Sequence, residues 1–474
     1  MENNTTKSGL SKQIRIFYGV GDMFFTLMCS VYSYYLTFYY TNVAMLSLAT
    51  VALLTTVSSI FDIATSWLYG AIINSTKPLK WGRYRSWLMV ITWLLPVTSF
   101  LLYCRIGKSE AVATVFFFIA MITSRIVQNT PYTANVAMIS IVAKTPDDRI
   151  HMSSTRATWN NASKFIWSYV GVPFLAILAG VVGEQYSYAT LAAILAVGTV
   201  FGYYAHFKMF EGYEDTGAAE MANAAKAKRA KTNPMDLMKA LFANVSLLSL
   251  LVIDLAKSLF SMMISGTVVY YFTYIALNKG LQANYTLIVA FASVFGSYAD
   301  RYIGKKLSGR KTMIIFYFLM AALLLVSRMF YTDVWLVIAL VSVAQLLYGC
   351  VATCSSALYC DAAVYSEWKT GKNAAGWVMG LSNVPIKIGS LLKSVLIPAA
   401  LAIGGFSAMI APADAPVAMC EAVVDCMLTI PAAFLILGAF VLIFVYRLPK
   451  EKVLQMQKEI DDKKAAEEAS AAES

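Results

Sequence analysis

An apolar segment from residue 45 to residue 73 carries a single charged side chain, Asp62. Its length suits a helix that crosses a lipid bilayer, which needs about 20 apolar residues. A lone carboxylate inside such a helix is costly unless it faces a cavity, an ion or a partner, so Asp62 is a candidate functional group. A dense basic turn follows at residues 80–85. This combination is typical of a membrane carrier and not of a soluble enzyme.

The composition of the whole chain agrees with a membrane protein. Hydrophobic residues make up 59% of the sequence and charged residues only 14%, whereas soluble globular domains carry about 25% charged residues. The net charge of +11 does not indicate nucleic-acid binding, because basic loops on one side of a membrane produce the same excess. The seven cysteines form no CxxC pair, and there are only two histidines. We therefore expect no metal site, no cofactor and no nucleic-acid partner.

Apolar segments of membrane length recur along the sequence. The 474 residues leave room for about twelve spans. We predict them at residues 14–42, 45–73, 86–104, 111–140, 156–182, 186–208, 243–276, 284–304, 312–331, 334–363, 374–405 and 418–446. Strongly basic loops alternate with loops that hold little beyond Arg105, Lys108 and Lys279. Since basic loops stay in the cytoplasm, both termini are expected there.

One long connection divides the predicted spans into two equal sets. It is rich in Ala, Lys and Glu and contains no apolar run of membrane length. The predicted organisation is an N-terminal six-helix bundle at residues 1–208, a cytoplasmic linker at 209–242, a C-terminal six-helix bundle at 243–447 and a charged cytoplasmic tail at 448–474. The predicted fold class is thus an all-α integral membrane protein with twelve transmembrane helices in two six-helix bundles.

The two halves repeat a loop pattern. In each half a glycine and an Asx residue four positions apart precede a Gly-Arg turn. The second copy resembles the loop signature of the major facilitator superfamily, which implies two six-helix bundles around a central cavity. We expect these loops to form the cytoplasmic gate, with the residues Gly70, Asn74, Arg83, Arg85, Asp300, Arg301 and Arg310.

Four predicted spans carry charged residues with a functional interpretation: Asp22, Asp62, Arg156 and Lys387. Asp62 and Lys387 lie too deep to reach the interface easily, which favours function. Arg156 lies near a span end, where snorkelling or gating explains it as well as substrate contact does.

Other intramembrane charges have a structural explanation. Asp254 and Lys257 are three residues apart on one helix face, so we expect them to pair with each other. Arg125 and Lys164 are expected to pair with neighbouring helices.

Prolines are predicted to interrupt the fourth and eleventh spans, at Pro131 and Pro385, because each removes a backbone hydrogen bond. Polar side chains beside these breaks are suited to contact sugar hydroxyls or carboxylates. An aromatic ring can also cover the face of a sugar, although packing explains any single aromatic residue better. The candidates of both kinds are Asn129, Tyr132, Trp159, Asn383 and Lys387.

Several motifs occur together in a fixed order along the chain. They are residues 18–22, 61–70, 81–87 and 129–132, Arg149 with Arg156, and residues 361–371. With these motifs the chain resembles the glycoside–pentoside–hexuronide:cation symporters over most of its length. The resemblance implies that Asp62 corresponds to a cation-site carboxylate, and that Arg156 and Lys387 correspond to basic residues at the sugar and cation sites. Asn129 falls where the melibiose-transporting members have a sugar-binding acid.

The sequence departs from the family pattern at the cation site. Ser66 replaces the second acid that those members carry one turn after the first, and Thr65 replaces a neighbouring amide. The sugar-binding acid of the first helix falls at Thr26, although Asp22 lies one turn earlier on the same face. Hydroxyl groups can still bind a hard cation, whereas a proton needs only one carboxyl group. Coupling to Na⁺, coupling to H⁺ and uncoupled transport therefore stay open.

The sequence predicts a secondary transporter of the inner (plasma) membrane that imports a sugar, glycoside or uronide with Na⁺ or H⁺ by alternating access. The alternatives are an uncoupled facilitator and a carrier of a lipid-like or drug-like cargo on the same fold. The sequence shows no nucleotide loop and no catalytic triad pattern, so an enzyme is not indicated. It leaves the identity of the sugar and the oligomeric state open. The predicted site consists of Asp62, Thr65 and Ser66 for the cation, and of Asp22, Thr26, Asn129, Tyr132, Arg156, Trp159, Asn383 and Lys387 for the substrate.

Overall fold

A computed structural model describes residues 9–75, 81–143, 146–214, 244–306, 308–370, 381–446 and 451–460, together with residues 378, 448 and 462. The chain forms two compact units. Unit 1 consists of Met1–Ala230 with Asn278–Leu287 and Ser407–Ala411, and unit 2 consists of Lys231–Leu277, Ile288–Phe406 and Pro412–Ser474. Most of the linker predicted at 209–242 and of the tail predicted at 448–474 lies outside the described residues.

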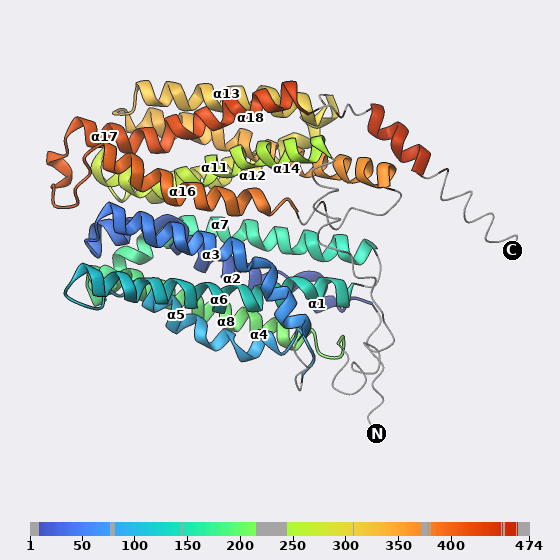
Figure 1. Ribbon diagram of the computed structural model, residues 1–474, viewed down its shortest axis with the longest axis horizontal. Helices are drawn as coiled ribbons and strands as arrows, with labels where there is room; N and C mark the ends of the chain where they lie inside the picture. The colour runs from blue at the N-terminus through green and yellow to red at the C-terminus, as the bar shows by residue number, and fades with distance from the viewer. Residues whose placement is uncertain are drawn as a thin grey trace, which may run out of the picture. The chain divides into compact units, whose positions relative to one another are not determined.

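Unit 1 is built from long helices that pack side by side (Figure 1). They are α1 (Lys12–Phe17), α2 (Val20–Phe38), which a π-helical turn (Tyr39–Val43) continues, α3 (Leu48–Ser75), α4 (Trp87–Val90), α5 (Leu95–Leu101), α6 (Glu110–Val142), α7 (Pro146–Val182) and α8 (Glu184–Met209). Helix α2 packs against α7 and α8, and α3 packs against α6. The polar residues of the candidate site lie where these helices meet.

Unit 2 is also helical. Its helices are α11 (Val245–Tyr274), α12 (Leu281–Lys306) from Ile288 onward, α13 (Gly309–Met329), α14 (Val334–Thr370), α16 (Val384–Ile403), α17 (Val417–Val424) and α18 (Ile430–Phe444), with a π-helical turn (Asp425–Thr429) between the last two. Helix α11 packs against α14, α16 and α18, and α13 packs against α14 and α18. The prediction of an all-helical chain is confirmed for the described residues.

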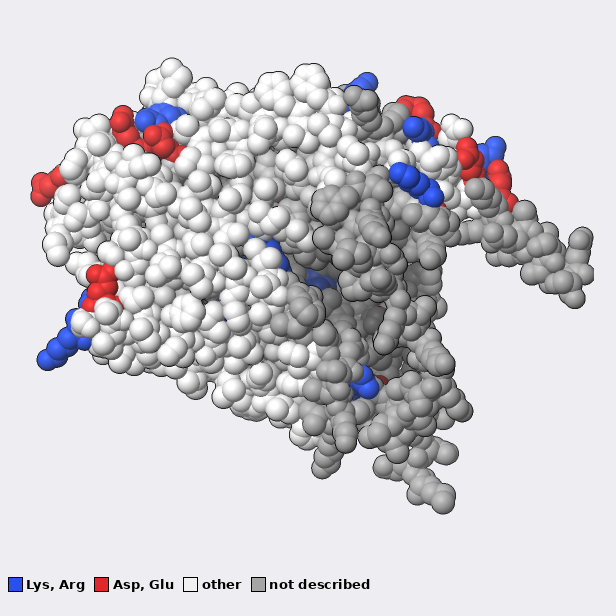
Figure 2. Space-filling view, in the orientation of Figure 1, with Lys and Arg blue, Asp and Glu red and all other residues white. Residues whose placement is uncertain are grey.

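Ten of the described helical segments are long and apolar enough to cross a membrane. Two shorter apolar helical segments, Trp87–Leu101 and Leu281–Ser297, fall at the third and eighth predicted spans. The space-filling view is almost entirely uncharged along the helices, and most acidic and basic atoms gather near helix ends (Figure 2). This distribution is what a bilayer demands of a lipid-facing surface.

Several helices extend beyond the apolar segments that mark them in the sequence. Helix α7 begins at Pro146, well before the predicted start at residue 156. Proline is favoured in the first turn of a helix, where its missing N–H group would have no intrahelical partner. Hydropathy marks only the part of a helix that crosses the bilayer, whereas backbone hydrogen bonding continues through polar residues.

The predicted break at Pro131 is absent, whereas the residues before Pro385 form a turn at 382–383 that follows helical residue 381 and precedes α16. Helix α6 is continuous through Pro131, because one missing backbone bond does not end a helix that its neighbours hold in place. Pro385 lies in the first turn of α16, where proline costs no intrahelical bond. Lys387 therefore lies in the first turn of α16, two residues after Pro385.

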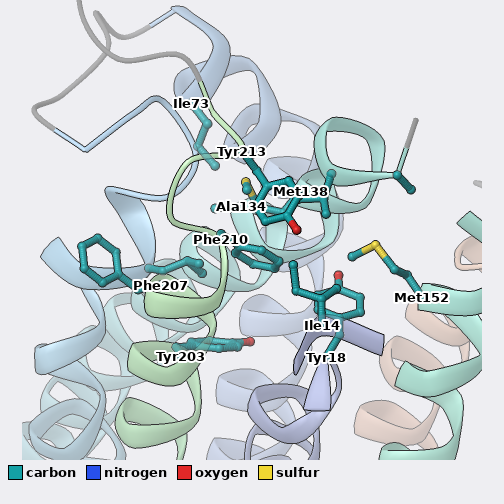
Figure 3. Close-up of a cluster of buried hydrophobic side chains, with 13 residues drawn as sticks. Ile14, Tyr18, Ile73, Ala134, Met138, Met152, Tyr203, Phe207, Phe210 and Tyr213 are labelled. Carbon is teal, nitrogen blue, oxygen red and sulfur yellow. The ribbon is translucent and has the colours of Figure 1, made fainter. Parts of the chain in front are cut away.

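A cluster of buried hydrophobic side chains closes one end of unit 1 (Figure 3). Tyr18, Met138, Tyr203 and Phe210 belong to it, and they come from the junction of α1 and α2, from α6 and from the end of α8. The Tyr18 hydroxyl group donates a hydrogen bond of 3.1 Å to the backbone carbonyl of Asn135. The cluster thus fixes α6 against α2 and α8 next to the buried polar residues.

Helices α12 and α14 approach each other closely in unit 2. A Cβ atom on Gly296 would collide with the carbonyl oxygen of Leu346, and one on Gly349 would collide with that of Ser293. The Cys350 thiol donates to the carbonyl oxygen of Gly296 at 2.9 Å. This close approach requires glycine at position 296, since only glycine leaves room for the facing backbone.

Candidate functional site

The carboxylate of Asp62 on α3 contacts α6. The Asn129 amide nitrogen Nδ2 donates a hydrogen bond of 2.7 Å to Asp62 Oδ1. Both side chains are only partly buried. A hydrogen bond thus joins a residue predicted to bind substrate to the residue predicted to bind the cation.

The structure describes the contacts of only one of the other two predicted cation ligands, Thr65 and Ser66. The Thr65 hydroxyl group donates to the carbonyl oxygen of Phe61 at 2.7 Å and lies 3.1 Å from the hydroxyl of Tyr69. Its oxygen retains a lone pair that can coordinate an ion. The side chain of Ser66 lies outside the described part of the chain.

Arg125 lies on α6 one helical turn before Asn129. Its guanidinium carbon is 4.2 Å from the centre of the Tyr32 ring on α2, and its charge is attracted by the charge of Asp62. From the sequence we predicted only that Arg125 pairs with a neighbouring helix, and we did not place it in the site. One feature of the sequence could have placed Arg125 in the site. It lies four residues before Asn129, so both side chains are on one face of the helix.

A second buried network lies where α2 meets α6 and α7. Asp22 is only 1% exposed. Its Oδ1 is 3.0 Å from a terminal guanidinium nitrogen of Arg156 on α7, and its Oδ2 accepts a hydrogen bond of 3.0 Å from Asn135 Nδ2 on α6. Arg156 therefore pairs with Asp22, whereas the sequence left snorkelling open. The pairing satisfies two charges that would otherwise be buried alone.

His206 on α8 completes this network, and it was not among the predicted residues. The backbone N–H of Gly21 donates to His206 Nε2 at 3.2 Å, and His206 Nδ1 lies 2.8 Å from Asn135 Oδ1. Because Nε2 accepts, the neutral ring carries its proton on Nδ1 and donates to Asn135. That bond orients the Asn135 amide so that its nitrogen faces Asp22. Nothing in the sequence around His206 indicated that it would hold Asn135 in position.

The remaining predicted substrate residues of unit 1 surround this network. The Thr26 hydroxyl group donates to the backbone carbonyl of Asp22 at 2.8 Å and lies 3.1 Å from Asn160 Oδ1. The guanidinium carbon of Arg156 is 5.1 Å from the Tyr132 ring centre. Trp159 donates its indole N–H to the carbonyl of Ile16 at 2.8 Å, so its polar edge is bound to the end of α1.

Asn383 and Lys387 belong to unit 2. The backbone N–H of Lys387 donates to the carbonyl of Asn383 at 3.3 Å, so the two residues are one turn apart at the start of α16. Asn383 is exposed and Lys387 is partly buried.

Asp254 and Lys257 form the pair that their spacing predicts. Lys257 Nζ is 2.8 Å from Asp254 Oδ1. Ser355 on α14 bridges the two charges, because its hydroxyl group donates to Asp254 and accepts from Lys257 Nζ at 3.0 Å. The pair thus joins α11 to α14.

Two of the predicted gate arginines occupy matching places in the two halves. Arg85 Nε donates to the carbonyl of Phe207 in the last turn of α8 at 2.6 Å. Arg310 donates to the carbonyls of Leu442 and Ile443 in the last turns of α18, at 3.1 and 3.0 Å. A cation is favourable at a helix C-terminus, where carbonyl groups lack intrahelical partners.

The other predicted gate residues are less fully described. Arg83 lies in the turn after α3 and is partly buried. The backbone at Gly70, Asn74, Asp300 and Arg301 is helical, but the side-chain surroundings of these residues lie outside the described part of the chain.

Comparisons with known proteins agree with this architecture. The family described as MFS/sugar transport protein matches residues 17–450. An uncharacterised symporter, YjmB, of Bacillus subtilis (strain 168) is 23% identical over 463 residues, which cover 97% of each chain. The isoprimeverose transporter of Lactiplantibacillus pentosus is 23% identical over 397 residues, which cover 83% of this chain and 81% of the relative.

A solved structure shares the fold. The crystal structure of a D-xylose–proton symporter matches with a TM-score of 0.66 and 15% identity, and the match covers 93% of this chain and 98% of the symporter. The apolar helices, the buried intramembrane charges and the family match over nearly the whole chain describe a multi-pass membrane transporter and not an enzyme. The chain belongs to the family of MFS/sugar transport proteins.

Proposed function

We propose that this protein is a symporter that imports a sugar, glycoside or uronide across the inner (plasma) membrane with Na⁺ or H⁺. In this proposal the chain crosses the membrane twelve times and both termini are cytoplasmic. The two short apolar segments, Trp87–Leu101 and Leu281–Ser297, supply the third and eighth crossings beside the ten longer ones. The names of the relatives, a symporter and an isoprimeverose transporter, support the substrate class.

The observation that carries the proposal is the hydrogen bond between Asn129 and Asp62. Asp62 lies in an apolar span of α3, where a charged group is retained only for a strong reason. Asn129 can bind a sugar hydroxyl group with the same amide that now holds the carboxylate. Cation binding to Asp62 and substrate binding to Asn129 would therefore alter one shared contact, which is the physical requirement for coupling.

The network around Arg156 supplies the second part of the proposed substrate site. Its guanidinium group is paired with Asp22 through one terminal nitrogen, and the group has further N–H donors in a planar fork. Tyr132, stacked on Phe25 with ring centres 4.8 Å apart, offers an aromatic face beside it. Hydroxyl-rich or carboxylate-bearing sugars present matching acceptors.

A transport assay tests this function. The purified protein is placed in liposomes, and uptake of radiolabelled isoprimeverose, D-xylose and a uronide is measured with an inward Na⁺ gradient, an inward H⁺ gradient or neither. Accumulation above equilibrium with one gradient supports a symporter. Equilibration without accumulation supports the uncoupled facilitator, which the serine at position 66 also favours. No uptake of any sugar contradicts the proposal.

Asp62→Asn separates coupling from substrate passage in the same assay. The variant should lose gradient-driven accumulation, because an amide neither binds a proton nor offers the charge that holds a cation. Exchange of labelled for unlabelled sugar should continue, which shows that the variant is folded. Undiminished accumulation by Asp62→Asn would leave Asp62 a structural residue.

A further inference from the structure

Lys164 on α7 is an isolated positive charge in a membrane span. It is the single charged residue in the apolar span at residues 158–182. Its ammonium group makes neither an ion pair nor a hydrogen bond with any described residue. The pairing with a neighbouring helix that we expected from the sequence is therefore not found in the described part of the chain. A charged group in such a span is retained where it meets a cavity, an ion or a ligand.

Lys164 lies on the side of α7 that faces the interior of unit 1. The large apolar residues Tyr169 and Ile177 are exposed, and the period of the α-helix places both on the side opposite to Lys164. Trp167, three residues after Lys164, is only 4% exposed. Its ring centre lies 5.9 Å from that of Tyr35 on α2. The lipid-facing side of α7 is therefore opposite to Lys164.

Polar contacts flank Lys164 one helical turn before it and one turn after it. Asn160 Oδ1 lies 3.1 Å from the hydroxyl group of Thr26 on α2. The Ser168 hydroxyl group donates to the carbonyl of Thr286 at 3.0 Å, on the part of α12 that belongs to unit 1. The side chain of Lys164 between these contacts is nevertheless exposed. Its ammonium group is therefore open to solvent on the inward side of α7.

Snorkelling to the lipid surface does not explain this position. Lys164 lies six residues inside the span that begins at Thr158, which is about 9 Å along the helix axis. Helical side chains tilt toward the N-terminus of their helix, so the stem of Lys164 extends toward the turn that carries Asn160. That turn is the one that contacts Thr26, a predicted substrate residue. The ammonium group thus lies beside the proposed substrate site and not on the lipid-facing side.

The charge of Lys164 lacks the compensation that its neighbour on the helix has. Arg156, two turns earlier on α7, is paired with Asp22 at 3.0 Å, whereas no described acid pairs with Lys164. An ammonium group has three donors and no acceptor, and hydrogen bonds between charged groups are about twice as strong as those between neutral groups. A carboxylate is therefore the group that suits this position best.

We propose that Lys164 is a specificity-determining residue that binds the carboxylate of an acidic sugar, so that the transported substrate is a uronide or a glycoside that contains one. This inference rests on the proposed function and narrows its substrate class. The Thr26 hydroxyl group, beside Asn160 and one turn from Lys164, would contact a hydroxyl group of the same sugar. A neutral sugar would leave the ammonium group without a charged partner and would bind more weakly.

Equilibrium binding to the purified protein tests the inference with two ligands that differ in charge. They are methyl β-D-glucuronide and its primary amide, which is similar in size and uncharged. The wild type should bind the glucuronide about tenfold to a hundredfold more tightly, the range that corresponds to a hydrogen bond to a charged group. Lys164→Met keeps an unbranched side chain and removes the charge, so this variant should bind the two ligands equally.

Two further variants and one further ligand serve as controls. Lys164→Arg retains the charge and should retain the preference for the glucuronide. Lys208→Met removes an exposed lysine in the last turn of α8, and it should leave the preference unchanged. Acetate carries a carboxylate without a sugar and should compete with the glucuronide only at much higher concentration.

The inference is overturned if Lys164→Met elutes like the wild type on size exclusion and still prefers the glucuronide. Equal affinity of the wild type for the two ligands also overturns it, and this comparison decides the question even if Lys164→Met does not fold. Acetate that binds as tightly as the glucuronide would show a simple anion site and would likewise contradict the inference.

Failure of this inference can be told apart from failure of the proposed function. A wild-type protein that binds neither ligand but takes up isoprimeverose or D-xylose in liposomes overturns the role of Lys164 and leaves the sugar symporter standing. Absence of uptake for every sugar tested contradicts the proposed function itself, and the assignment of Lys164 then fails with it.

Discussion

The amide of Asn129 on α6 donates a hydrogen bond of 2.7 Å to the carboxylate of Asp62 on α3. The two residues are 67 positions apart in the chain, and the contact exists because α3 packs along α6. One hydrogen bond thereby joins the side chain that the sequence assigns to the cation and one that it assigns to the substrate.

Ser66→Asp should create a dependence on sodium. Residue 66 lies one turn after Asp62 in α3, so a second carboxylate would stand on the same helix face. Two carboxylates repel each other unless a cation lies between them. Na⁺ should then stimulate uptake in liposomes by about tenfold or more. The control is Ser66→Asn, which is similar in size and uncharged. An ion response identical to that of the parent protein would show that residue 66 does not line the site.

Lys387→Ala should weaken substrate binding or its coupling to the cation. Lys387 is a partly buried ammonium group in the first turn of α16, and such charges in a membrane protein mark functional paths. Lys387→Arg retains the charge and serves as the control. Uptake and ion dependence are measured for both variants. Wild-type behaviour of Lys387→Ala would reduce Lys387 to a snorkelling side chain.

His206→Phe should destabilise unit 1 and weaken substrate binding. Phenylalanine keeps a ring in the fully buried position of His206 but can neither accept from the Gly21 N–H nor donate to Asn135. Each buried polar group left without a partner costs about 1–3 kcal/mol. Asn135 would no longer be held toward Asp22, so the pair with Arg156 would loosen.

Thermal unfolding and equilibrium sugar binding measure both effects. Tyr204→Phe on the same helix is the control, since Tyr204 is 40% exposed and a single exposed substitution changes stability by less than about 0.5 kcal/mol. Equal melting temperatures for the two variants would show that the His206 hydrogen bonds contribute nothing to the fold.

Gly296→Ala should separate α12 from α14. The new Cβ atom would meet the carbonyl oxygen of Leu346, a backbone atom that cannot rotate away. Overpacking of this kind costs about 1–3 kcal/mol or more. Gly180→Ala on α7 is a matched control, because no atom lies within 4 Å of its added Cβ. A lower melting temperature for Gly296→Ala alone confirms the close approach, and equal values for both variants contradict it.

Part of the arrangement of charged residues can be predicted from the sequence, because it depends on the spacing of residues along a single helix. Asp62 stands out as the one charge in an apolar run, and Asp254 pairs with Lys257 at 2.8 Å, as a spacing of three residues predicts. The break at Pro131 was predicted wrongly, whereas a turn does precede Pro385 at residues 382–383; the effect of a proline depends on where a helix begins and on what supports it. Pro385 lies in a first turn, and α6 continues through Pro131.

From the sequence alone we could predict that the chain is helical, that it contains apolar segments of membrane length and which charges are unusual. Lipid offers no hydrogen bonds, so each span must satisfy its backbone internally, and a continuous apolar segment is enough to identify it. Which polar groups contact one another depends on how the helices pack in three dimensions. Asn129 with Asp62, His206 with Asn135, and Arg85 with the end of α8 join residues 67, 71 and 122 positions apart. Such contacts arise from the packing of one helix against another, and no spacing along a single helix specifies them.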